Sequence, residues 1–448
     1  MNLPPLTADD FSAFFRELWG SDCDPFPWQR EFARRLCSGK VPDYVAVPTG
    51  SGKTACLDAA VFALAMQATL PMAERTQGRR IFFIVNRRVI VDEAYDRAGK
   101  LCKKLRDAAS DSVAGRVAAA LRKLSGEVEA APLTRAQLRG GIYRDRSWAD
   151  SLLQPMIVCS TVDQAGSRLL FRGYRLHQPA GCETVQLPFQ LIQMTATPPA
   201  NTRDDQKITL SPEDHEHPVL KPRLRSAKPA RLVVEPKAKG KNREERNKQL
   251  ANRLVEEAEK ILADEDDPPR SIAIMVNRVA TARSIAAKLD KEHKGRVTLL
   301  IGRLRPLDRE ATTKEIQERL KTGAAPSALE SGPLIVVSTQ CLEVGADLDF
   351  DALVTEASSL DALRQRFGRL NRGGREIAAR AVIVLPGDQD LPTDKLDEAA
   401  PCDPIYGNAI PRTWRWLSSL TQVGVVDFGI NAMSAAVDSI RSTGTGRA

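Results

Sequence analysis

Two glycines, a lysine and a threonine stand close together in the run Val47-Pro48-Thr49-Gly50-Ser51-Gly52-Lys53-Thr54. A short apolar run, 44–47, precedes them and an apolar-periodic segment, 55–70, follows, which predicts a strand, a turn and a helix. The glycines let the turn close tightly, so that its N–H groups and the positive end of the helix dipole point at phosphate oxygens. At this spacing the lysine reaches the β- and γ-phosphates and the threonine hydroxyl binds Mg²⁺. We therefore predict a site for ATP and Mg²⁺ made of Thr49, Gly50, Ser51, Gly52, Lys53 and Thr54, with Lys53 catalytic and Thr54 as metal ligand.

The composition is that of an ordinary globular protein, with 27% charged and 42% hydrophobic residues in a chain of 448, enough for two or three domains. The net charge is +8, from 65 Lys+Arg against 57 Asp+Glu, which favours a polyanionic partner. The eight cysteines show no zinc-ligand spacing, so we expect reduced, mostly buried thiols in a cytoplasmic protein. The longest apolar stretch, 59–70, is too short to span a bilayer, and we expect no membrane partner.

Apolar runs and helical periodicity alternate along most of the chain, which predicts an α/β protein with parallel sheets covered by helices on both faces. The first block contains predicted strands at 44–47, 81–85, 155–161 and 191–194, and predicted helices at 28–36, 112–124, from residue 88 to 105 and from residue 162 onward. The second block contains predicted strands at 271–276, 296–301, 334–338, 352–354 and 381–385, and predicted helices at 250–262, 280–289, 309–320 and 360–370.

Two further segments differ in composition. Residues 200–249 are rich in Pro, Lys and Arg, which favours a solvated connector over a dedicated nucleic-acid patch. The chain from about residue 386 is rich in Pro and Asp before helical patterns at 414–420 and 432–440. We assign no fold to this last part.

Three more motifs follow the phosphate loop in order. Residues 195–197 read Thr-Ala-Thr, residues 337–347 read Val-Ser-Thr-Gln-Cys-Leu-Glu-Val-Gly-Ala-Asp, and residues 365–372 read Gln-Arg-Phe-Gly-Arg-Leu-Asn-Arg. With these motifs the chain resembles a superfamily 2 DExD/H-box helicase, and most of all the helicase part of the CRISPR-associated helicase–nuclease of type I systems. The resemblance covers about residues 20–390. It implies two tandem RecA-like domains with ATP bound between them, at 1–225 and 226–390, and leaves 391–448 as a C-terminal extension.

The resemblance implies further nucleotide contacts. Gln29 stands where the family reads the adenine base, although a surface glutamine is an open alternative. Gly345, Asp347 and Gln365 match positions that bind the nucleotide. Arg369 and Arg372 match the arginine fingers on the γ-phosphate, and their spacing places them on one helical face.

The resemblance also implies contacts to a nucleic-acid strand. Arg87 and Arg88 match a motif that contacts the backbone, and their alternative is a solvated helix start. Thr161, in the run 160–164, matches a phosphate contact. Thr339 and Gln340 match residues that touch the strand. Thr195 and Thr197 match the motif that couples the ATP state to domain movement.

The family's acidic pair that anchors Mg²⁺ and orients the attacking water is missing from its expected place. Between Gln164 and Thr195 the only acid is Glu183, and no apolar strand precedes it. Asp92 and Glu93 lie in the helix after the 81–85 strand, so we interpret them as helix surface. The interval is also short by a strand and a helix, roughly 17 residues at average lengths. We hypothesise an internal deletion at about 181–187, which would retain ATP binding and impair hydrolysis.

The leading interpretation is an ATP-dependent DNA helicase or translocase of type I CRISPR interference, recruited to an RNA-guided surveillance complex and acting on single-stranded DNA. One alternative is a non-hydrolysing remnant that binds nucleotide and single-stranded DNA. Another is a superfamily 2 helicase acting on RNA, or a restriction translocase. None of the histidines, at 177, 215, 217 and 293, precedes an aspartate, so the family's HD nuclease is either a separate chain or lies outside this one.

Overall fold

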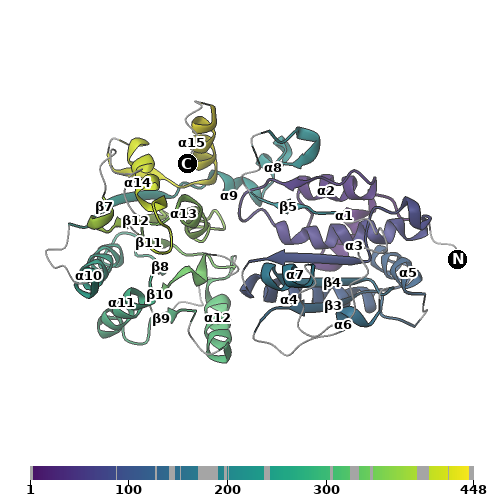
Figure 1. Ribbon diagram of the computed structural model, residues 1–448, viewed down its shortest axis with the longest axis horizontal. Coiled ribbons are helices and arrows are strands. Elements are labelled where there is room, and N and C mark those ends of the chain that lie inside the picture. The colour runs from purple at the N-terminus through teal and green to yellow at the C-terminus, as the bar shows by residue number, and fades with distance from the viewer. Residues whose placement is uncertain are drawn as a thin grey trace. The chain divides into compact units, whose positions relative to one another are not determined.

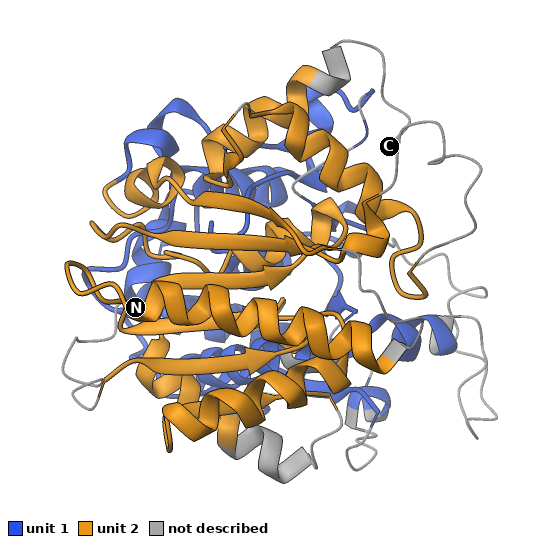
Figure 2. Ribbon diagram, turned by 90° about the vertical axis from the view of Figure 1, so that its left-hand side faces the viewer, with its two compact units in different colours: residues 1–217 blue, residues 218–448 orange. Residues whose placement is uncertain are grey.

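The computed structural model divides the chain into two compact units, residues 1–217 and 218–448 (Figure 2). It describes residues 4–86, 88–126, 129–140, 147–151, 153–169, 190–195, 199, 201–236, 243–302, 306–322, 332–343, 347–390, 403–421 and 423–442. Both units combine parallel sheets with helices, so the predicted α/β class is confirmed. Within the described residues, no helix is long and apolar enough to cross a membrane.

The phosphate-loop region of unit 1 is built on a small parallel sheet. In it β1 (Tyr44–Val45) lies between β5 (Gln193–Met194) and β6 (Lys207–Ile208). The helices α2 (Pro27–Cys37) and α3 (Cys56–Met66) pack against each other. The sequence analysis did not predict α1 (Asp10–Trp19), whose phenylalanines Phe11 and Phe14 are buried against Phe62 of α3.

A second parallel sheet of unit 1 has the order β2-β4-β3, formed by β2 (Arg80–Val85), β4 (Met156–Thr161) and β3 (Thr134–Leu138). Every residue of β4 is buried, as expected for a central strand. Around this sheet the chain forms α4 (Arg88–Arg106), α5 (Val113–Ser125), α6 (Ser147–Asp150) and α7 (Val162–Leu169).

The described strands of unit 1 thus form two three-stranded sheets and not one continuous sheet. The edge strand β2 exposes Phe82 and Ile84, which share one face by the two-residue period of a strand, and the edge strand β5 exposes Met194. Large apolar side chains on edge strands are unusual because they invite further pairing. The hypothesised deletion at 181–187 itself lies outside the described residues and stays a hypothesis.

Unit 2 contains a seven-stranded sheet in the order β13-β7-β12-β11-β8-β10-β9, in which only the edge strand β13 is antiparallel. Five of these strands were predicted and match closely: β8 (Ser271–Met275), β9 (Val297–Leu300), β10 (Leu334–Ser338), β11 (Ala352–Glu356) and β12 (Arg380–Leu385). All residues of β8, β10 and β11 are buried, which explains their unbroken apolar runs.

Helices cover both faces of this sheet and create two hydrophobic cores (Figure 1). On one face, α10 (Arg243–Leu262) and α11 (Val279–Glu292) pack side by side. The other face carries α12 (Pro306–Leu320), α13 (Leu360–Phe367), α14 (Ala409–Ser419) and α15 (Ile430–Ser442). There Phe367 stacks on Phe428 with ring centroids 3.9 Å apart.

The interpretation of residues 200–249 as a solvated connector is wrong. This segment supplies β6 to unit 1 and β7 (Pro229–Val234) to unit 2, together with α8 (Pro212–Glu216), α9 (Leu220–Arg225) and the start of α10. The strand β7 was missed because basic and proline residues interrupt its apolar positions, of which Ala230 and Val233 are buried. The tail likewise joins unit 2, because β13 (Val425–Asp427) pairs with β7.

Short 3₁₀ turns complete the described structure, at η1 (Lys53–Ala55), η2 (Gln67–Thr69), η3 (Met72–Glu74), η4 (Asp204–Gln206), η6 (Gln340–Leu342) and η7 (Gly387–Gln389). Two of them, η1 and η6, belong to the candidate site.

Candidate functional site

The phosphate loop has the backbone that its glycines predict. It leaves β1, passes through Gly50 with φ 87° and Gly52 with φ 75°, and enters η1 and then α3. Both φ values lie in the left-handed region that favours glycine. A Cβ at Gly52 would also stand 2.8 Å from Nε2 of Gln29, so a larger residue there would displace the Gln29 amide. The strand, turn and helix expected for this motif are therefore present.

Two side chains of α2 form hydrogen bonds to backbone carbonyls of the loop. Trp28 donates its indole N–H to the carbonyl of Ser51 at 3.1 Å, and Gln29 donates from Nε2 to the carbonyl of Gly52 at 3.0 Å. The amide oxygen of Gln29 accepts from the backbone N–H of Phe26 at 2.9 Å. Because Gln29 is buried, the alternative of a surface glutamine is wrong. Its role at adenine stays a prediction. In the structure its amide stabilises the loop through the bond to the carbonyl of Gly52.

Lys53 bridges the two ends of the loop, since its Nζ donates to the carbonyl of Val47 at 2.6 Å. Thr49 is exposed, Ser51 is buried, and Thr54 is half-buried in η1. A phosphate bound in the loop would compete with the Val47 carbonyl for the ammonium group. Lys53 is thus held beside the position where the motif predicts the β- and γ-phosphates.

Other predicted residues lie at the carboxyl ends of parallel strands in the two sheets of unit 1. Thr195 follows β5, next to β1, and donates its N–H to the carbonyl of Val45 at 3.1 Å. In the second sheet Thr161 ends β4 opposite Val85 of β2, after which Arg88 begins α4. The carboxyl ends of neighbouring parallel strands are where α/β proteins build ligand sites. Arg87 and Thr197 lie outside the described residues.

Asp92 lies on α4, as predicted, and is partly exposed, but its carboxylate makes contacts with neighbouring residues. Its carboxylate pairs with Arg139 at 2.6 Å and accepts from Nε2 of Gln137 of β3 at 2.5 Å. These contacts tie α4 to the edge of the second sheet. Asp92 therefore has a structural task at that edge.

In unit 2, the residues predicted to contact a nucleic-acid strand, Thr339 and Gln340, follow β10 at the start of η6. Thr339 is buried, while Gln340 donates from Nε2 to the carbonyl of Asn277 at 3.1 Å. Asn277 follows β8, the strand next to β10 in the sheet. Asp347 accepts from the hydroxyl of Thr322 at 2.8 Å. Gly345 lies outside the described residues, and Gln365 is half-buried on α13.

Arg369 and Arg372 do not share a helical face, so that prediction is wrong. The helix α13 ends at Phe367, and the chain then turns through Asn371 with φ 38°. The carboxylate of Asp349, which is distant along the chain, stabilises this turn. It accepts from the N–H of Arg372 at 2.7 Å and from the N–H of Gly373 at 3.1 Å.

The turn nevertheless brings both arginines to the residues 337–347. Arg372 pairs with Asp347 at 3.0 Å, and Arg369 donates from Nε to the carbonyl of Leu342 at 3.1 Å. Arg369 is buried and Arg372 is partly exposed, so Arg372 is the more accessible of the two guanidinium groups. The two motifs most specific to the helicase resemblance are thus in direct contact.

Residues 269–375, which contain both of these motifs, match the family model described as "CRISPR-associated nuclease/helicase Cas3, C-terminal". The resemblance to the CRISPR-associated helicases is confirmed. Two curated Cas3 proteins support it at the level of sequence. The Cas3 of Thermus thermophilus is 36% identical over 124 residues, and that of Methanothermobacter thermautotrophicus is 32% identical over 108 residues; each match covers 24% of this chain.

Solved structures support the same fold over nearly the whole chain. The structure of T. fusca Cas3 with AMPPNP matches with a TM-score of 0.60 and 17% identity, covering 99% of this chain and 54% of that one. The DEAD-box helicase Mss116 bound to single-stranded RNA and UDP-BeF matches with a TM-score of 0.53 and 14% identity, covering 89% of this chain and 79% of that one. This chain spans about half of the solved Cas3, and the matches span 12% and 13% of the curated relatives.

The sequence analysis missed Arg366, which lies in the middle of the Cas3-like motif 365–372. Its side chain is fully buried, and its five N–H groups make five hydrogen bonds of 3.0 Å or less and a sixth, of 3.5 Å, to the hydroxyl of Tyr406. The acceptors are Glu343 Oε1 (3.0 and 2.8 Å), Thr355 Oγ1 (2.8 Å), the carbonyl of Glu356 (2.9 Å) and Asn277 Oδ1 (2.8 Å). Arg366 thereby ties the helix α13 to η6 and to the ends of β8 and β11.

Lys228 was also missed, because it lies in the segment interpreted as a connector. Its ammonium is buried and donates to the carbonyl of Phe367, the last residue of α13, at 2.9 Å. Burial lowers the pKa of Lys228 to about 8, against a partial opposing effect of Asp349. This lysine supports the end of the helix from which Arg369 and Arg372 follow.

The stability of the protein is expected to depend on the protonation of Lys228. Because the pKa is about 8 in the folded state and 10.5 in the unfolded state, the unfolded chain binds more protons between these values. Below pH 8 the folded protein carries the full free-energy cost of burying the charged ammonium of Lys228. This cost decreases as the pH rises toward 10.5. The free energy of unfolding should therefore rise by about 3 kcal/mol across this window, relative to Lys228→Met.

Urea unfolding at several pH values measures this difference, and Lys321→Met, at an exposed lysine, serves as the control. The control should follow the wild type. Parallel pH profiles for the wild type and Lys228→Met would contradict the assignment.

Proposed function

We propose that this chain is an ATP-driven motor of CRISPR interference, a helicase or translocase that acts on single-stranded DNA with an RNA-guided surveillance complex as its partner. The observation that carries the proposal is the contact between the two Cas3-like motifs of residues 269–375, through Arg372 with Asp347 and Arg369 with Leu342. Cas3 is described as a CRISPR-associated nuclease/helicase, and one solved relative was crystallised with the ATP analogue AMPPNP.

In this proposal each group of residues has a separate task. The N–H groups of residues 49–54 and the ammonium of Lys53 bind the phosphates, and Thr54 would hold Mg²⁺, which neutralises charge on the β- and γ-phosphates. Arg372, and Arg369 beside it, stabilise the negative charge that develops during phosphoryl transfer. Thr161, Thr339 and Gln340 stand at strand ends where polar groups can bond to the phosphates of a nucleic-acid strand.

A specific observation favours a second candidate, a protein that binds nucleotide and single-stranded DNA without hydrolysing ATP. The described strands of unit 1 form two separate sheets, and the sequence from Gln164 to Thr195 lacks an acidic pair. Without such a pair no carboxylate of that interval anchors Mg²⁺ and orients the attacking water. The two candidates share the ATP site and differ only in turnover.

The deciding experiment measures ATP hydrolysis by the purified chain with no nucleic acid, with single-stranded DNA and with single-stranded RNA. DNA-stimulated turnover that disappears in Lys53→Ala supports the motor and contradicts the deletion hypothesis. ATP binding without turnover above that of Lys53→Ala supports the non-hydrolysing candidate. Stronger stimulation by RNA than by DNA would instead assign the chain to the RNA-acting helicases.

A further inference from the structure

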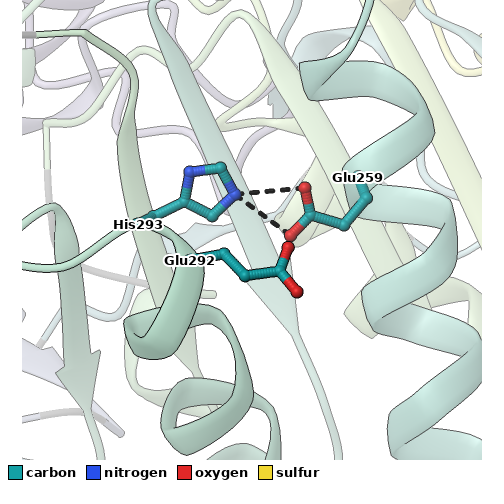
Figure 3. A group of neighbouring side chains, drawn as sticks. All are labelled: Glu259, Glu292 and His293. Carbon is teal, nitrogen blue, oxygen red and sulfur yellow. Dashed lines mark hydrogen bonds and ion pairs between the residues drawn. The ribbon is translucent and has the colours of Figure 1, made fainter.

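Three side chains that play no part in the proposed motor converge on the face of unit 2 covered by α10 and α11 (Figure 3). They are Glu259, Glu292 and His293. The imidazole Nε2 of His293 lies 3.0 Å from Oε1 and 3.1 Å from Oε2 of Glu259. One oxygen of Glu292 completes the group, and the three atoms, one from each residue, all lie within 4.8 Å of one another.

Rigid elements hold these side chains together. Glu259 lies on α10, Glu292 is the last residue of α11, and His293 follows it with its N–H bonded to the carbonyl of Leu289 at 2.8 Å. The two helices pack through one buried core that includes Leu254, Ala258, Ile285 and Leu289. Sites on packed helices keep their ligand geometry better than sites on loops.

The local charge favours a cation. Two carboxylates face each other across a short distance, where like charges repel. The carboxyl end of the 14-residue helix α11 adds partial negative charge at the same place. His293 supplies the one nitrogen ligand of the group. Its imidazole distinguishes this cluster from a merely acidic one.

We propose that Glu259, Glu292 and His293 form a binding site for one divalent transition-metal ion of the zinc class. Imidazole together with carboxylates suits Zn²⁺, Co²⁺ and Ni²⁺ better than Mg²⁺ or Ca²⁺, which prefer oxygen ligands alone. Zinc bonds of about 2.0–2.2 Å place tetrahedral ligand atoms about 3.4 Å apart. The observed nitrogen–oxygen distances of 3.0 and 3.1 Å reach this value after a shift of a few tenths of an ångström.

The bound ion would link α10 to α11 and leave at least one coordination position for water. Because metal binding to the folded state alone stabilises that state, the ion raises the melting temperature of the protein. This site is independent of ATP and of nucleic acid, so its test does not depend on the proposed motor.

The test uses chelator-treated full-length protein, titrated with Zn²⁺ in thermal unfolding and with Co²⁺ in visible absorption. The wild type should show a metal-dependent rise in melting temperature and cobalt bands typical of nitrogen and oxygen ligands. In His293→Gln and Glu259→Gln the affinity for Zn²⁺ should fall at least tenfold. The matched control is Glu256→Gln, an exposed carboxylate on the same helix, which should behave like the wild type.

Three results would overturn the proposal. The first is a wild type without a cobalt spectrum and without a metal-dependent shift. The second is a shift that His293→Gln retains, or a cobalt–thiolate band, which would place the ion at cysteine residues. The third is an unchanged affinity in Glu292→Gln, because the site would then lack its third protein ligand.

Discussion

Replacement of Arg366 by methionine is expected to lower the free energy of unfolding of unit 2 by about 3–5 kcal/mol, the usual cost of breaking a buried ion pair by removing one partner. The substitution leaves the carboxylate of Glu343 buried without its cation, 2.8 Å from where the guanidinium stood. It also removes the donors to Asn277, Thr355 and the carbonyl of Glu356. The loss of a donor at each of these buried acceptors is also unfavourable, so about 3–5 kcal/mol is the lower end of the expected destabilisation.

Hydrogen exchange measures this effect separately for each unit. Amides of β8, β10 and β11 in unit 2 should exchange faster in Arg366→Met, while those of β4 in unit 1 should not change. The same substitution at Arg283, an exposed arginine on α11, is the control and should alter neither unit. Equal protection of β11 in Arg366→Met and in the wild type would show that the buried network adds little to stability.

Replacement of Lys53 by alanine is expected to weaken ATP binding roughly 10- to 150-fold, from the loss of about 1.5–3 kcal/mol that hydrogen bonds to charged groups contribute. The ammonium lies in the loop whose N–H groups we propose to bind phosphate, and its bond to the carbonyl of Val47 could be exchanged for one to phosphate. Calorimetric titration with a non-hydrolysable ATP analogue measures the dissociation constant.

The control for this experiment is Lys40→Ala, at an exposed lysine just before β1, which should bind the analogue as tightly as the wild type. Thermal unfolding without nucleotide shows whether the loop survives the loss of the Val47 contact. Unchanged affinity in folded Lys53→Ala would exclude Lys53 as a phosphate ligand and would contradict the ATP site of the proposed motor.

Much of the fold can be predicted from local patterns. The strand β10 was predicted at its observed bounds, because five residues in succession are buried on both faces of a parallel sheet. The phosphate loop was also predicted from a local property. The left-handed backbone of Gly50 and Gly52 depends on the absence of a side chain. By contrast, β3 and β7 alternate apolar residues with basic or polar ones, and only pairing with their neighbours reveals them as strands.

For the candidate site, the sequence by itself determined which residue types are available at which spacing: the loop 49–54, the polar pair Thr339-Gln340 and the arginines of 365–372. The tertiary structure decided which of them meet and how. Gln29 supports the loop from 23 residues away, and Arg366 reaches Asn277 across 89 residues. The end of α13 also depends on a residue distant along the chain. Asp349 accepts hydrogen bonds from the N–H groups of the turn that contains Arg372. Backbone shape within a few residues follows from local sterics and hydrogen bonding, whereas partners distant along the chain are chosen only when the sheet has formed and buried them together.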